Sequence, residues 1–128
     1  MNGRSTDLLV FDTCVIIPAL KDKSLVDLLD KFAASDRFIS VITRIELLSF
    51  HSLTDEETCL INLFFDSVTV VPLNNDVEEK AIEFRRLTKH KTPDAIIAAT
   101  SIVLNAVLFT RDSRLLGQNF PGLETLRL

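Results

Sequence analysis

The sequence predicts an α/β fold in which helices cover both faces of a mainly parallel sheet. Short apolar runs alternate with helical patterns along the chain, which is typical of strand–helix–strand units. Gly occurs only 3 times and Pro only 4 times, and no repeat or linker interrupts the pattern. With 128 residues, 47% apolar and 25% charged, the chain has the composition of a globular protein, and we expect one domain over residues 1–128.

The strands are predicted from short apolar runs. A continuous run of this kind is typical of a strand that is buried on both faces of a parallel sheet. The predicted strands are, in order, Leu8–Phe11, Phe38–Ile42, Val68–Val71, Val107–Thr110 and a short fifth within Leu123–Leu128.

The helices are predicted from apolar periodicity and from capping residues. Leu25–Phe32 places apolar side chains three and four residues apart, which puts them on one helical face. Three further helices are predicted: Ile45–Phe50 after Thr43, Asp55–Asp66, and one capped by Asn75 with Glu78 completing a capping box. Thr92-Pro93 opens the last, Asp94–Leu104, which is apolar almost all round and is therefore expected to be buried.

Composition and charge limit the classes of function. The net charge of −4 argues against binding long nucleic acid by bulk charge alone, although a local basic rim remains compatible with it. Cys14 and Cys59 provide neither a disulfide framework nor a zinc site, so we expect two reduced thiols in apolar surroundings. The first apolar run, Leu8–Phe11, is too short for a secretory leader, and the longest uncharged stretch, Ala95–Thr110, contains polar residues, so we expect a cytoplasmic protein without a membrane span.

Four carboxylates stand at element boundaries: Asp12, Glu46, Asp94 and Asp112. In a parallel sheet the ends of the strands and the starts of the following helices share one edge, where ligands bind. Carboxylates that converge repel one another unless they are protonated or hold a cation. Oxygen ligands suit Mg²⁺ or Mn²⁺, and such an ion promotes hydrolysis of a phosphoester.

Each acid also has an ordinary structural explanation. Glu46 completes a capping box with Thr43, Asp94 complements a helix dipole, Asp112 caps a short helix, and Asp12 bonds within a strand-to-helix turn. For each acid taken alone the structural explanation is preferred, but the placement of all four at one edge of the sheet favours a cation-binding site. Rival chemistries are poorly supplied, because His51 and His90 both fall in segments expected to be solvated and no nucleophile-elbow, phosphate-loop or dinucleotide motif is present.

With these residues in place, the sequence resembles the PIN-domain nucleases, in particular the VapC-type toxins of toxin–antitoxin pairs. Four segments carry the resemblance in order, and the third is the most specific: LVFDTCVII (9–17), VITRIELL (41–48), TPDAIIAATSI (92–102) and LFTRDSRLL (108–116). FPGLETLRL (120–128) is similar to the closing segment of that family.

The resemblance implies a three-layer α/β/α fold with strand order 3-2-1-4-5 and a Mg²⁺ or Mn²⁺ site for RNA cleavage. It implies that Asp12 and Asp94 bind metal directly, that Asp112 does so directly or through water, and that Glu46 positions metal or the attacking water. Thr13 and Thr110 match small polar positions that orient water or phosphate. Cys14 departs from the Ser common in the family, and we expect it to pack at the strand end without cost.

The resemblance also implies an RNA substrate, a cognate antitoxin partner and a homodimer. Among the basic residues, we expect Lys91 and Arg111 to contact phosphates that flank the cleaved bond. The others are expected to be ordinary solvated charges: Arg44, Lys89, His90 and Arg114.

Three alternatives stay open at this point. One is a non-catalytic RNA-binding or interaction module with the same fold, against which the full set of acids argues. A phosphoacceptor receiver domain requires an Asp after the third strand, where Val71-Pro72-Leu73-Asn74 has none. A haloacid-dehalogenase-type phosphatase requires a second Asp where this chain has Cys14.

Overall fold

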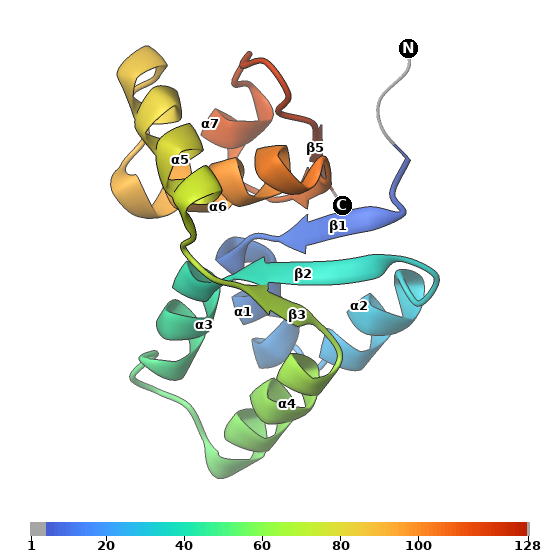
Figure 1. Ribbon diagram of the computed structural model, residues 1–128. Helices are drawn as coiled ribbons and strands as arrows, with labels where there is room; N and C mark the ends of the chain where they lie inside the picture. The colour runs from blue at the N-terminus through green and yellow to red at the C-terminus, as the bar shows by residue number, and fades with distance from the viewer. Residues whose placement is uncertain (1–4, 128) are drawn as a thin grey trace.

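The computed structural model describes residues 5–127, in which five parallel strands form one sheet (Figure 1). The strands are β1 (Leu8–Phe11), β2 (Asp36–Ser40), β3 (Thr69–Val71), β4 (Val107–Phe109) and β5 (Thr125–Leu126). Their order is β3-β2-β1-β4-β5, which confirms the predicted fold class and strand order. The end of the predicted fifth strand, Leu128, lies outside the described residues.

The first strand lies at the centre of the sheet. Leu9 is paired with Arg37 of β2 on one side and with Val107 of β4 on the other. Because side chains alternate along a strand, Leu9 and Phe11 enter one hydrophobic core and Val10 enters a second core on the opposite face. The sheet is therefore buried on both faces, as the continuous apolar runs predict.

Four helices pack around the first core, the lower layer in Figure 1. They are α1 (Thr13–Lys21), α2 (Leu25–Lys31), α3 (Val41–Leu48) and α4 (Asp55–Asp66). Phe11 and Phe109 point from the sheet into a cluster with Phe32 and Phe64, in which the ring centroids lie 5.2 to 6.1 Å apart. Aromatic burial of this kind makes a large contribution to the stability of a small domain.

The second core lies under α5 (Asn75–Leu87), α6 (Thr92–Leu104) and the short α7 (Ser113–Leu116). Ala95, Ala98 and Ala99 of α6 are fully buried, and their small side chains let this helix approach β1 closely. The buried helix predicted from Asp94 to Leu104 is thus confirmed, with Thr92 and Pro93 in its first turn. Within residues 5–127, no helix has the length and apolar character needed to cross a membrane.

Some sequence-based boundaries were wrong, and one helix was not predicted. The second strand ends at Ser40, whose side chain accepts a hydrogen bond from the Ile42 backbone N–H and so starts α3, instead of Thr43 starting it. Helix α5 is capped by Asn74, which accepts from the Val77 N–H, and not by Asn75; the N3 position is therefore Val77, and the predicted capping box with Glu78 was wrong. Helix α1 was not predicted at all, because Pro18 and a run of β-branched residues weaken the helical signal there.

The two cysteines are free, as expected, but their surroundings differ from the prediction. Cys59 is exposed on α4 instead of lying among apolar side chains. Cys14 is half-buried and makes polar contacts that are described below.

Candidate active site

The carboxyl ends of the central strands collect the predicted acids. Asp12 follows β1 directly, and Asp112 follows β4 after two residues. Helix α6 ends at Leu104 and β4 begins at Val107, with Asn105 in the left-handed conformation (φ 57°) making the turn. Because this short connection holds the end of α6 near the start of β4, the first turn of α6, which carries Asp94, lies at the opposite edge with Asp12 and Asp112.

Asp12 is the most buried of the four acids, with 5% of its surface exposed. Its backbone N–H donates to the Phe109 carbonyl at 2.9 Å, which joins the end of β1 to β4. The Oδ2 atom accepts hydrogen bonds from Thr110 Oγ1 at 2.7 Å and from Cys14 Sγ at 3.3 Å. Asp12 occupies the N-cap position of α1, but its side chain makes no capping hydrogen bond, so a local turn does not explain this carboxylate.

Cys14 belongs to this polar cluster, which corrects the expectation that it only packs at the strand end. Its sulfur lies 3.5 Å from Thr110 Oγ1 and accepts from the Arg111 backbone N–H at 3.4 Å. Burial, followed by the nearby charge of Asp12, raises the pKa of the Cys14 thiol. The thiol therefore stays protonated at neutral pH and can donate its hydrogen to Asp12.

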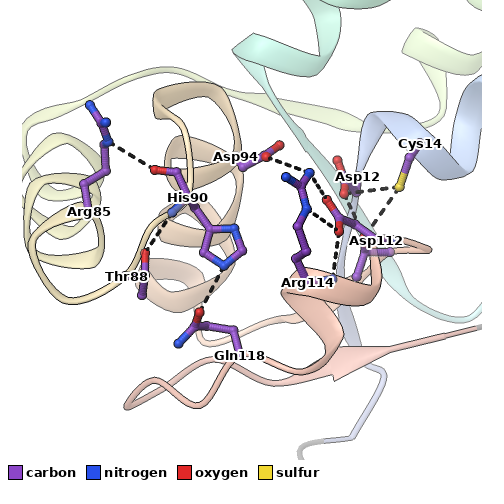
Figure 2. A network of polar contacts seen from close by, with 10 residues as sticks. Asp12, Cys14, Arg85, Thr88, His90, Asp94, Asp112, Arg114 and Gln118 are labelled. Atoms are coloured by element: carbon purple, nitrogen blue, oxygen red, sulfur yellow. Dashed lines mark hydrogen bonds and ion pairs between the residues drawn. The ribbon is translucent and has the colours of Figure 1, made fainter.

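Asp94 and Asp112 share one cationic partner, Arg114 (Figure 2). The Nη2 atom of Arg114 lies 3.1 Å from Asp112 Oδ2 and 3.9 Å from Asp94 Oδ2. Burial raises the pKa of Asp94, and the charges of Asp12 and Asp112 raise it further. These shifts place the three acids within electrostatic reach of one another.

The hydrogen bonds from Arg114 have the opposite effect on Asp112, because they lower the pKa of that carboxyl. Asp112 also caps α7, since its Oδ1 accepts from the Arg114 backbone N–H at 2.9 Å. The predicted capping role of Asp112 is thus confirmed, and it coexists with the ion pair.

Glu46 is bonded to a threonine of α1. Thr13 Oγ1 donates to Glu46 Oε1 at 2.7 Å and lies 2.9 Å from Thr43 Oγ1. The predicted capping box between Thr43 and Glu46 was wrong, because α3 begins at Val41 and Thr43 is buried inside it. Glu46 is exposed, and its hydrogen-bond donor Thr13 is the residue that follows Asp12.

The two threonines hold carboxylates in place: Thr110 binds Asp12, and Thr13 binds Glu46. Thr110 Oγ1 also accepts from the Asp112 backbone N–H at 3.0 Å, so one hydroxyl connects two of the acids. Their predicted contacts to water or phosphate remain predictions.

The donor atoms fit a hard divalent cation. Across residues 5–127, no three acidic, imidazole or thiol side chains are already grouped as a metal site. Yet Asp12, Asp94 and Asp112 offer only carboxylate oxygens, which are the ligands that Mg²⁺ and Mn²⁺ prefer. Burial, and after it the charges of Asp12 and Asp112, raise the pKa of Asp94, and the guanidinium of Arg114 beside Asp94 and Asp112 shows that positive charge is accommodated there.

The predicted phosphate-binding residues flank this cluster. Lys91 is the N-cap residue of α6, and Arg111 lies between Thr110 and Asp112; both are exposed. Arg111 also borders an open groove of about 410 Å³ between α1 and α2, whose other lining residues include Val15, Ala19 and Leu28. Arg44 instead stacks over the Phe65 ring, with its guanidinium carbon 4.8 Å from the ring centroid.

A buried network supports the start of α6, and the sequence reading missed it. His90 was expected in a solvated turn, but it is buried, stacks on Phe84 and has Nε2 3.1 Å from Gln118 Oε1 (Figure 2). Arg85 donates from Nε to the His90 carbonyl at 3.2 Å and from Nη1 to Thr92 Oγ1 at 2.9 Å. This network fixes the turn that precedes Asp94.

Comparison with known proteins agrees with this arrangement. A sequence profile described as PIN domain matches residues 9–119, a span that contains all four acids. No curated protein sequence gives a significant match.

Solved structures share the fold. A chain of VapBC2 from Rickettsia felis, solved bound to a DNA fragment from its promoter, superposes with a TM-score of 0.79 at 18% identity, covering 94% of this chain and 98% of that one. DNA-bound VapBC from Salmonella typhimurium gives 0.77 at 20% identity, covering 93% and 96%. VapBC-1 from nontypeable Haemophilus influenzae gives 0.75 at 22% identity, covering 94% and 97%.

Proposed function

This chain belongs to the PIN domain family, and from that premise we propose that it is a Mg²⁺- or Mn²⁺-dependent endoribonuclease that acts as the toxin of a VapBC-type pair. One observation carries the nuclease proposal: three carboxylates from β1, α6 and the end of β4 lie within electrostatic reach at one sheet edge. Helix capping accounts for one bond of Asp112, whereas the buried Asp12 carboxylate makes no capping bond and is held by Thr110 and Cys14.

The side chains have distinct proposed roles. Asp12, Asp94 and Asp112 supply oxygen ligands, and Thr110 and Cys14 fix the Asp12 carboxylate by donating to its Oδ2 atom. A bound Mg²⁺ or Mn²⁺ supplies Lewis-acid polarisation of a phosphoryl oxygen and lowers the pKa of bound water. Glu46, held by Thr13, accepts a proton from the attacking water or orients it.

Substrate binding requires local positive charge, because the protein as a whole carries −4. Lys91 precedes the first turn of α6, and Arg111 precedes Asp112, so each sits beside an acid of the site. We assign these two side chains to the phosphates on either side of the cleaved bond, where they neutralise charge without reading sequence.

The nuclease proposal predicts the effect of charge-removing substitutions. Asp12→Asn and Asp94→Asn keep side-chain size but remove a ligand charge, and each should lower RNA cleavage at least about a hundredfold, about 2.7 kcal/mol in the barrier. Cleavage of a labelled RNA is measured with Mg²⁺, with Mn²⁺ and with EDTA, and EDTA should abolish it. Cleavage that survives in EDTA at the same rate in wild type and both variants exposes a contaminant and removes the support for the proposal.

A non-catalytic RNA-binding module with the same fold is the alternative function. Such a module binds RNA without cutting it, and Asp94→Asn would tighten its binding by removing a negative charge beside the phosphates. RNA binding by filter retention, run beside the cleavage assay, therefore distinguishes the two functions.

Exposed apolar side chains on α3 and α4 support the proposal that this domain binds other protein chains. Ile45 and Leu48 on α3 are 57% and 46% exposed, and Leu63 on α4 is 62% exposed. Apolar surface of this kind is typical of interaction faces when it is contiguous. We therefore infer a homodimer that binds a cognate antitoxin, and the mass of the protein in solution, measured by light scattering with and without the antitoxin, tests both.

A further inference from the structure

The side chain of Arg114 lies between the carboxylates of Asp94 and Asp112 (Figure 2). Its Nε donates to Asp112 Oδ1 at 3.3 Å and its Nη2 donates to Asp112 Oδ2 at 3.1 Å, so the guanidinium binds both oxygens of this carboxylate. The same Nη2 lies 3.9 Å from Asp94 Oδ2. One side chain of the protein thus neutralises two acids that come from different elements.

This geometry goes beyond a fortuitous surface pair. The backbone N–H of Arg114 donates to Asp112 Oδ1 at 2.9 Å, so the start of α7 holds residue 114 beside the carboxylate. A bidentate guanidinium–carboxylate contact is also stronger than an ion pair made through a single hydrogen bond.

The oxygens that Arg114 contacts are those that the proposed function assigns to the metal. A carboxylate oxygen bonded to a guanidinium has fewer lone pairs for a cation, and two positive charges within a few ångströms repel each other. The side chain of Arg114 is 69% exposed, so it can swing into water at little energetic cost.

We propose that Arg114 is a built-in competitor of the divalent cation: its guanidinium neutralises Asp94 and Asp112 in the metal-free protein and leaves them when the ion binds. This inference rests on the proposed metal site. The competition raises the concentration of divalent ion that is needed to fill the site, because the Arg114 guanidinium must first leave the two carboxylates.

The test is Mn²⁺ binding to the metal-free protein, followed by the electron paramagnetic resonance signal of free Mn²⁺. Arg114→Gln should lower the dissociation constant at least about threefold, the size expected for loss of a competing surface ion pair. Arg86→Gln is the matched control, because it removes the same charge from an exposed position in the last turn of α5, and within residues 5–127 no ion pair involves its side chain. It should change the constant less than twofold.

A second measurement protects the test from misfolding. Substitution of the Arg114 side chain leaves the backbone cap of α7 intact, and thermal melts should show a larger Mn²⁺-induced rise in Tm for Arg114→Gln than for wild type. Equal tightening in Arg114→Gln and Arg86→Gln, or weaker binding in Arg114→Gln, overturns the competitor role while the metal site survives. Absence of Mn²⁺ binding in wild type and in both variants overturns the metal site itself.

Discussion

Asp94 and Asp112 show how surroundings set two carboxylates of one site apart. Asp94 is partly withdrawn from water and faces the charges of Asp12 and Asp112, so its pKa is raised. Asp112 receives hydrogen bonds from Arg114, so its pKa is lowered. The folded protein therefore binds a proton at Asp94 more tightly, and at Asp112 less tightly, than the unfolded chain does.

These two shifts predict opposite effects of pH on metal-free stability. The contribution of Asp94 to the free energy of unfolding is largest at low pH, and it is lost as pH rises from the unfolded pKa of about 3.9 through the raised folded pKa. The contribution of Asp112 has the opposite sign: it is gained as pH rises from the lowered folded pKa to the unfolded pKa of about 3.9. At pH 7 in EDTA, Asp94→Asn should be as stable as wild type or more stable, and Asp112→Asn less stable. The midpoints of urea unfolding, measured for wild type and both variants from about pH 3 to about pH 8, test these differences in stability.

The gain from Asp94→Asn should shrink on acidification, because protonated Asp94 is neutral like Asn. A loss of stability in Asp94→Asn of the same size at every pH would show that Asp94 is merely a helix-terminal residue complementing the dipole of α6.

The sequence located the acids but not their bonding partners. Asp12 and Asp94 could be assigned to one edge because strand ends and helix starts share it. The bond from Thr110 to Asp12 joins residues far apart in the chain, so no local pattern predicts it, whereas Cys14 lies only two residues after Asp12 but was expected to pack among apolar side chains. The Arg114 pair had a usable signal, an Arg two residues after a helix-capping Asp, although a solvated charge was the expectation there.

Among the elements, helices with strong apolar periodicity were predicted more accurately than the points at which strands end and helices begin. Helix α4 has the predicted bounds Asp55–Asp66, and Thr54 and Glu57 form a capping box that marks its start. Strand β2 stops at Ser40 although Val41 and Ile42 continue the apolar run, because the Ser40 side chain satisfies the first free N–H of α3. Hydrophobicity alone does not carry this information.

Helix α6 should tolerate no larger side chain on its sheet-facing side. Ala98 is fully buried in the second core, so Ala98→Leu adds volume where none is free and should cost about 1–3 kcal/mol of unfolding free energy. Ala34→Leu is the matched control at an exposed position and should change stability by less than about 0.5 kcal/mol. Urea unfolding of both variants measures the difference.

If Ala98→Leu is as stable as the control, α6 is not closely packed on the sheet. The position of Asp94 would then depend on the turn held by Arg85 and His90.

For the whole molecule, the order of the strands followed from the resemblance, and the alternation of strands and helices alone leaves that order open. The parallel sheet brings residues from β1, α3, α6 and the end of β4 to one edge, and the acids occur at these four places. The dimer and the antitoxin leave no comparable local signal in the chain, so they remain proposals.

The toxin proposal predicts a phenotype of the whole molecule. Expression of the wild-type protein alone should arrest bacterial growth, Asp94→Asn should not, and co-expression of a protein from the adjacent reading frame should restore growth. Colony counts after induction, at matched soluble amounts of the two proteins, measure the effect. If both proteins are equally harmless, the toxin role fails, although RNA cleavage in vitro can still stand.

The bond between Thr110 Oγ1 and Asp12 Oδ2 joins residues 98 positions apart, so the two halves of the proposed site are synthesised at different times during translation. A ribosome that adds about 5–20 residues per second makes Asp12 roughly 5 to 20 s before Thr110 exists. Through that interval the nascent chain has the first acid but neither β4 nor Asp112. The nascent chain therefore cannot complete the proposed site until nearly the whole domain has been translated, so any activity of that site begins only after synthesis.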